Sequence, residues 1–135
     1  MKLQIWGLAR KHLLASCILL DKNFQVNWHH KVIAEELERI EEKIKNKESK
    51  TTFLILEVPP RHGKSLLASI NFPAWFLGRN PDKHVILSSY SAELSQDFGH
   101  KTREIVGSKE YKIIFPNMTL REDSQAKNKW ITDQW

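Results

Sequence analysis

The feature that most constrains the fold is an apolar run that stops at two adjacent prolines. Residues 53–58 are apolar except for one glutamate, and Pro59 and Pro60 follow them directly. Such a run is typical of a strand buried on both faces of a parallel sheet. The prolines end the strand because proline has no N–H to donate to a sheet ladder. The polar residues 61–65 then lead into the apolar segment 66–77, so the order predicts a strand, a tight turn and a helix.

Helical patterns precede this unit. Residues 8–20 suit a short helix, and a longer helix that ends near Lys47 is marked by apolar residues at spacings of four, three and four. This apolar stripe consists of Ile33, Leu37, Ile40 and Ile44. The glutamates on the other face of the same helix are expected to be solvated. They are Glu35, Glu36, Glu38, Glu41 and Glu42.

Downstream of the unit, strand and helix patterns alternate. Pro73 is expected to kink or interrupt the helix predicted over 66–77, because it lacks an N–H. Residues 84–89 indicate a second buried strand, and Ser91 is a candidate N-cap for a helix that extends to about Val106. Two further short strands are expected at residues 113–115 and 130–132. The alternation predicts an α/β fold, with a parallel sheet flanked by helices.

Size and charge limit the class of function. The 135 residues have room for one domain, at about 100–200 residues each. The net charge of +5 is spread over both halves of the chain, which permits a nucleic-acid partner without requiring one. The single cysteine, Cys17, excludes an internal disulfide framework and suits a reducing cytoplasm. The apolar run 13–20 is too short to span a bilayer, which takes about 20 residues. We expect a buried helix there and no membrane partner, with an export signal as the alternative.

Residues 58–65 carry the clearest chemical motif. A phosphate-binding loop needs a buried strand, a tight turn, Gly-Lys-Ser/Thr and a helix that starts there, and Gly63, Lys64 and Ser65 supply the tripeptide. Backbone amides at the helix N-terminus form an anion site. Lys64 would reach the outer phosphates, Ser65 would bind Mg²⁺, and a Cβ at Gly63 would obstruct the phosphate. The glycine usual five residues earlier is Val58 here, so a strand–helix turn with an exposed lysine stays open as the alternative.

The segment Val58-Pro59-Pro60-Arg61-His62-Gly63-Lys64-Ser65 resembles the variant Walker A loop of the bacteriophage terminase large subunit, the ATPase of the DNA-packaging motor. Flanking segments resemble that family in the same order, and the resemblance covers nearly the whole chain. These segments are Trp28-His29-His30, residues 72–81, Ser88-Ser89-Tyr90-Ser91, Phe98-Gly99, Ile114-Phe115-Pro116 and Asp123-Ser124-Gln125-Ala126.

By this resemblance the chain is expected to be the N-terminal portion of an ATP-driven motor that packages double-stranded DNA into the prohead. The implied fold is that of a P-loop NTPase, and the implied cofactors are ATP and Mg²⁺. The residues implied to bind ATP are Arg61, His62, Gly63, Lys64 and Ser65, with Ser65 on Mg²⁺ and Arg61 as a catalytic arginine at the γ-phosphate. A surface arginine paired with a local carboxylate is the alternative for Arg61. Double-stranded DNA, the portal and the small terminase subunit are the implied partners, in the host cytoplasm.

The acidic strand that ATP hydrolysis requires is missing from the sequence. One acid must hold the metal and a neighbour must polarise water, but none of the eight acidic residues after Ser65 directly follows four apolar residues. We therefore expect a helical segment over 1–50 and the front part of the ATPase domain over 51–135, truncated before the Walker B strand and without the nuclease domain. Such a chain alone is not expected to hydrolyse ATP, and its incomplete sheet predicts exposed apolar surface. The alternatives are a helicase-like P-loop ATPase and a non-functional prophage remnant.

Overall fold

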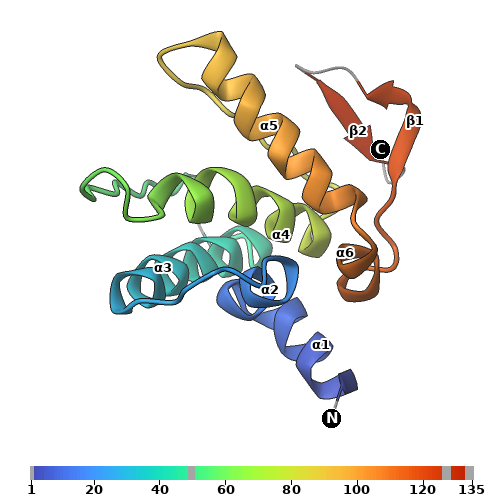
Figure 1. Ribbon diagram of the computed structural model, residues 1–135, viewed down its shortest axis with the longest axis horizontal. Helices are drawn as coiled ribbons and strands as arrows, with labels where there is room; N and C mark the ends of the chain where they lie inside the picture. Colours follow the sequence, from blue (N-terminus) through green and yellow to red (C-terminus); the bar gives the residue numbers. More distant parts are fainter. Residues whose placement is uncertain (1, 49–50, 126–128, 133–135) are drawn as a thin grey trace.

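The computed structural model describes residues 2–48, 51–125 and 129–132, and most of its elements are helices (Figure 1). The helices are α1 (Lys2–Lys11), α2 (Leu13–Leu20), α3 (Trp28–Lys45), the π-helical turn η1 (Leu66–Asn71), α4 (Phe72–Arg79), α5 (Ala92–Gly107) and α6 (Lys109–Ile114). The strands are β1 (Leu120–Gln125) and β2 (Trp130–Thr132). The rod formed by η1 and α4 lies between α3 and α5.

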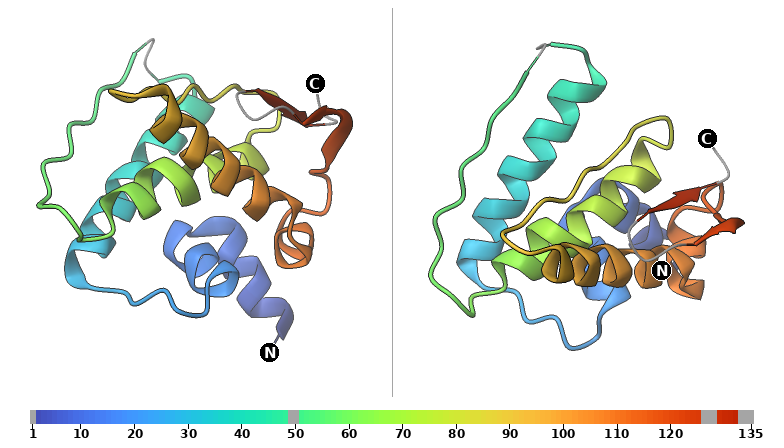
Figure 2. Two further views of the ribbon diagram at one scale, coloured as in Figure 1. Left: turned by 45° about the horizontal axis from the view of Figure 1, so that its top comes forward. Right: turned by 90° about the horizontal axis from the view of Figure 1, so that it is seen from above.

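The expected parallel sheet is absent from the described ranges, so the α/β fold class predicted from the sequence is wrong. Residues 53–58 and 84–89 form loops instead of strands, and Figure 2 shows these two loops running apart. A strand obtains its backbone hydrogen bonds from a neighbouring strand, and neither loop provides one for the other. Alternate side chains of the first loop still pack on the core, whereas Phe53 and Ile55 are 87% and 83% exposed.

The helix after the first loop forms as predicted, with an irregularity ahead of Pro73. Residues 64–79 are helical without a break, but η1 within them is widened to π-helical geometry. At the end of η1 the Phe72 N–H donates to the Leu67 carbonyl, five residues back. Pro73 has no N–H, and its ring clashes with the carbonyl four residues earlier in a regular helix. The widened turn therefore precedes the proline.

The N-terminal apolar run is helical, as expected, and partly buried: Leu13, Ser16 and Cys17 are buried, whereas Ile18 is 48% exposed. The helix predicted over 8–20 is divided into α1 and α2, which separate at His12. Leu13 begins α2 and donates its backbone N–H to the Glu38 carboxylate at 2.7 Å. Across the described residues, no helix has both the length and the apolar content that a membrane-spanning segment requires.

The core gathers side chains from every described helix around Trp75. The Trp75 indole N–H donates to the Ala9 carbonyl at 3.2 Å, and the Tyr111 hydroxyl donates to the Ala74 carbonyl at 2.8 Å. Cys17 belongs to the same cluster, and burial raises the pKa of its thiol to about 12. A thiol with such a pKa is neutral at physiological pH, so Cys17 is a core residue and not a nucleophile.

The solvated face predicted for the glutamates of α3 is wrong at Glu41, which is 1% exposed. Its carboxylate accepts from Arg79 Nε at 2.9 Å and from Asn80 Nδ2 at 2.9 Å. The Arg79 guanidinium also lies 4.9 Å from the centre of the Trp75 ring. This buried group of polar side chains joins α3 to the end of α4.

The C-terminal part contains two capped helices and a hairpin. Ser91 caps α5 by accepting the Leu94 N–H at 3.2 Å, which confirms the predicted start. Ser108 caps α6 in the same way, so the strand predicted at 113–115 is wrong. The helical spacing of the buried residues Tyr111, Ile114 and Phe115 explains this difference. The hairpin arm predicted at 130–132 is confirmed, because β2 pairs antiparallel with β1.

Candidate phosphate-binding loop

The 59–65 loop follows residues 53–58 and ends with the first two residues of the helix that begins at Lys64. Two residues of the loop have left-handed backbone geometry. Gly63 has a φ of 74° and Arg61 has a φ of 65°. Glycine adopts this conformation without a steric penalty. A non-glycine residue there is uncommon, and such outliers gather at functional sites.

Three backbone carbonyls of the 59–65 loop accept hydrogen bonds from within the protein. The His62 ring donates from Nδ1 to the Pro60 carbonyl at 2.8 Å. The His62 carbonyl accepts from two α3 side chains, His29 Nε2 and His30 Nε2, each at 3.0 Å. The Gly63 carbonyl accepts the Leu67 N–H at 2.9 Å. These three carbonyls are therefore satisfied within the protein.

The backbone amides of the same turn are not used in this way. The N–H groups of Gly63, Lys64 and Ser65 donate to no other residue that the structure describes. They lie at the N-terminus of the continuous helix 64–79, where the helix dipole contributes positive potential. Unpaired amides at such a position favour an anion such as phosphate.

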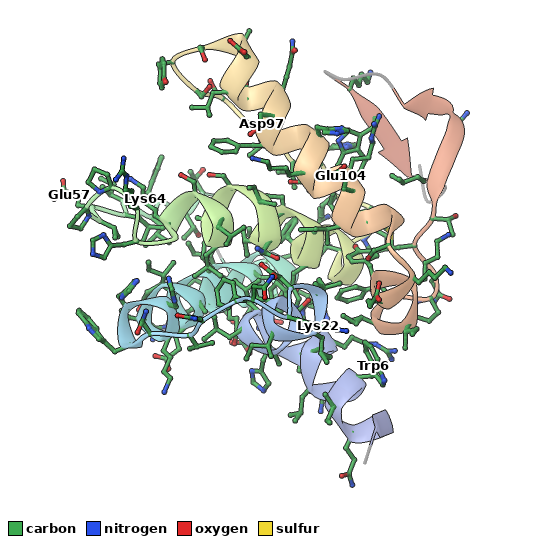
Figure 3. All side chains as sticks on the ribbon, in the orientation of Figure 1. Trp6, Lys22, Glu57, Lys64, Asp97 and Glu104 are labelled. Carbon is green, nitrogen blue, oxygen red and sulfur yellow. The ribbon has the colours of Figure 1, made fainter. Side chains whose placement is uncertain are left out.

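The positively charged side chains of the 59–65 loop remain accessible to a ligand. Arg61, His62 and Ser65 are exposed and Lys64 is half-buried. Figure 3 shows Lys64 at the same end of the molecule as Glu57. Within the described part of the chain, neither Arg61 nor Lys64 forms an ion pair, so the structure does not pair Arg61 with a local carboxylate.

Asp97 and Glu104 of α5 lie away from this loop (Figure 3). Asp97 pairs with Lys101 at 2.7 Å, and Glu104 lies 3.4 Å from His100, all on the exposed surface of α5. In the described ranges, no group of three or more His, Cys, Asp or Glu side chains is arranged to hold a metal ion.

Sequence reasoning missed the two α3 histidines that contact the loop. Adjacent residues on a helix point in different directions, yet the centres of the His29 and His30 rings lie 4.1 Å apart and both rings contact the His62 carbonyl. The signal was Asn27, the N-cap residue before α3, whose backbone N–H donates to His30 at the third position of the helix. His30 also gives Gly63 a second role, because a Cβ at Gly63 would lie 2.7 Å from His30 Nε2.

A comparison with known protein families gives a match to this region. The family described as terminase large subunit, T4likevirus-type, N-terminal, matches residues 55–130, which is more than half of the chain. The match includes the whole 59–65 loop with η1, α4 and α5. No curated protein matches the chain, and no solved structure matches it. The chain therefore belongs to the family of T4-like terminase large subunits, in its N-terminal portion.

Proposed function

We propose that the protein binds the phosphates of Mg-ATP at the 59–65 loop, as the ATP-binding part of a phage DNA-packaging motor. The observation that carries this proposal is the set of three amides, at Gly63, Lys64 and Ser65, that have no acceptor among the described residues. Family membership supports the wider packaging role. Double-stranded DNA, the portal and the small terminase subunit are proposed partners on the same basis.

The residues present fit a bound phosphate chain. The three amides supply donors, and the half-buried Lys64 supplies a positive charge beside them. Bound Mg²⁺ neutralises charge on the phosphate oxygens, and the exposed Ser65 hydroxyl is the group that would hold it. Arg61 is exposed and without an ion pair in the described structure, so it is available to the outer phosphate.

Calorimetric titration of the wild type and Lys64→Ala with Mg-ATP tests the proposal. Loss of a charge-assisted contact is expected to weaken binding by about 1.5–3 kcal/mol, or roughly 10- to 100-fold in Kd. Lys101→Ala is the matched control, because Lys101 pairs with Asp97 on the surface of α5. This substitution should leave the Kd for Mg-ATP unchanged. Equal affinity of the wild type and Lys64→Ala would contradict the proposal.

A further inference from the structure

We propose that His29 and His30 are positioning residues, which hold the His62 carbonyl and thereby aim the Gly63 amide into the phosphate site. The inference rests on the proposed function of the 59–65 loop. It assigns a role to the start of α3, which lies outside the range that matches the terminase family. Three observations carry it. They are the ring nitrogens that carry a hydrogen, the aromatic side chains that pack against the two rings, and the geometry of the peptide bond between His62 and Gly63.

The contacts of His30 determine which ring nitrogen carries its proton. Its Nδ1 lies 3.1 Å from the backbone nitrogen of Asn27. An amide nitrogen only donates, so Nδ1 must be the unprotonated acceptor. Nε2 then carries the hydrogen of the neutral ring and donates it to the His62 carbonyl at 3.0 Å. His30 thus connects Asn27, the N-cap residue of α3, to the loop through both ring nitrogens.

His29 donates to the same oxygen from a second direction. A carbonyl only accepts, so His29 Nε2, at 3.0 Å, must also carry a hydrogen. The two lone pairs of the His62 carbonyl are therefore both engaged. The His29 ring stands edge-on to Trp28 with centres 5.7 Å apart, and the Phe24 ring lies 5.3 Å from His30. His30 is only 6% exposed, so water competes little for its hydrogen bond.

The planar peptide bond passes this constraint on to the next residue. In a trans peptide the C=O of His62 and the N–H of Gly63 point in opposite directions. Because both rings hold the carbonyl toward α3, the Gly63 N–H faces away from α3, on the side where a phosphate would bind.

Without the two histidines this orientation would be poorly fixed. Glycine adopts positive and negative φ almost equally well, so the His62–Gly63 peptide is one that rotates easily. Rotation by half a turn would break both bonds to the carbonyl and bring the Gly63 N–H against two ring N–H donors. The histidines therefore oppose the rotated form, in which the amide cannot bind phosphate.

The test compares a polar and an apolar variant of His30. His30→Gln retains an amide N–H donor for the His62 carbonyl and an amide oxygen that can accept the Asn27 N–H, whereas His30→Leu has neither. The expected result is a Kd for Mg-ATP raised about tenfold in His30→Leu, as for the loss of one hydrogen bond, and restored toward the wild type in His30→Gln. A role limited to capping α3 would also be restored by glutamine at His30, so the same pair of variants at His29, which does not cap the helix, isolates the contact with the loop.

The pair His29→Leu and His29→Gln repeats the comparison at a half-buried position, which keeps the proposal testable if His30→Leu does not fold. Wild-type binding with an unchanged Kd in the folded leucine variants would overturn the positioning role and leave the proposed function standing. A glutamine variant as weak as its leucine counterpart would also overturn it. A wild type that binds no Mg-ATP would instead overturn the proposed function, and this inference with it.

Discussion

At the scale of single residues, the 59–65 loop depends on how backbone groups are paired. Its carbonyls at Pro60, His62 and Gly63 have donors, while the amides from Gly63 to Ser65 have no acceptor in the described structure. A turn in which these carbonyls are paired and consecutive amides are left unpaired is suited to an anion. Gly63 is central because it combines a positive φ with close approach to His30.

Gly63→Ala is expected to destabilise the protein and weaken Mg-ATP binding. The new Cβ meets His30 Nε2 at 2.7 Å, and alanine is strained at a φ of 74°. Such backbone strain costs about 1–3 kcal/mol. Chemical denaturation measures the loss. Gly99→Ala is the control, because its Cβ would meet nothing within 4 Å inside helix α5, and alanine there should be neutral or stabilising by up to about 1 kcal/mol. Equal stability of the two variants would refute the steric argument.

At the scale of elements, a buried polar group decides how α3 meets α4. Glu41 accepts from Arg79 Nε and Nη2 and from Asn80, and Arg79 Nη1 also donates to the Arg10 carbonyl at 2.9 Å. These contacts connect α1, α3 and α4. Since α3 also carries the histidines that contact the 59–65 loop, its position relative to α4 bears on the site.

Glu41→Ala should therefore be among the most destabilising substitutions in α3. It leaves the Arg79 guanidinium, whose side chain is 20% exposed, without its carboxylate. Breaking a buried ion pair in this way costs about 3–5 kcal/mol. Glu36→Ala is the control, because the Glu36–Arg39 pair on the same helix is exposed and worth at most about 1 kcal/mol. Urea denaturation followed by circular dichroism checks both, and similar losses would contradict the prediction.

At the scale of the whole molecule, apolar surface remains uncovered, which confirms the expectation from the sequence. Ile86 is 91% exposed and Tyr90 is 93% exposed, in addition to Phe53 and Ile55. All four lie in or beside the two segments that were expected to be strands. Lys64 in the 59–65 loop is likewise separated in the fold from Asp97 and Glu104 of α5 (Figure 3).

The isolated chain is expected to release phosphate from ATP more slowly than about once per second, the lower end of common enzyme turnover. Catalysis of phosphoryl transfer relies on positioned groups, and in the described structure Asp97 and Glu104 face other partners on α5. A phosphate-release assay measures the rate, with Lys64→Ala to correct for contaminating ATPase. A faster rate that disappears in Lys64→Ala would mean that a carboxylate of this chain serves the reaction.

Binding to double-stranded DNA is expected to be weak and independent of sequence. The net charge is +5, with basic residues in both halves of the chain, so phosphate contacts should dominate. Fluorescence anisotropy across a salt series is expected to give a Kd of about 10⁻⁴–10⁻⁶ M that rises steeply with salt. Tight binding that is selective for sequence and resistant to salt would contradict this.

The sequence by itself determined the features whose interactions are local. The apolar stripe of α3, the Ser91 cap of α5 and the turn at Gly63 were all predicted, because helix bonds and caps join residues four or fewer positions apart. Tertiary structure alone decided whether residues 53–58 and 84–89 became strands, since a strand takes its hydrogen bonds from distant segments. It likewise decided the burial of Glu41 and the contact of His29 and His30 with His62, because these partners lie more than 30 residues apart in the chain.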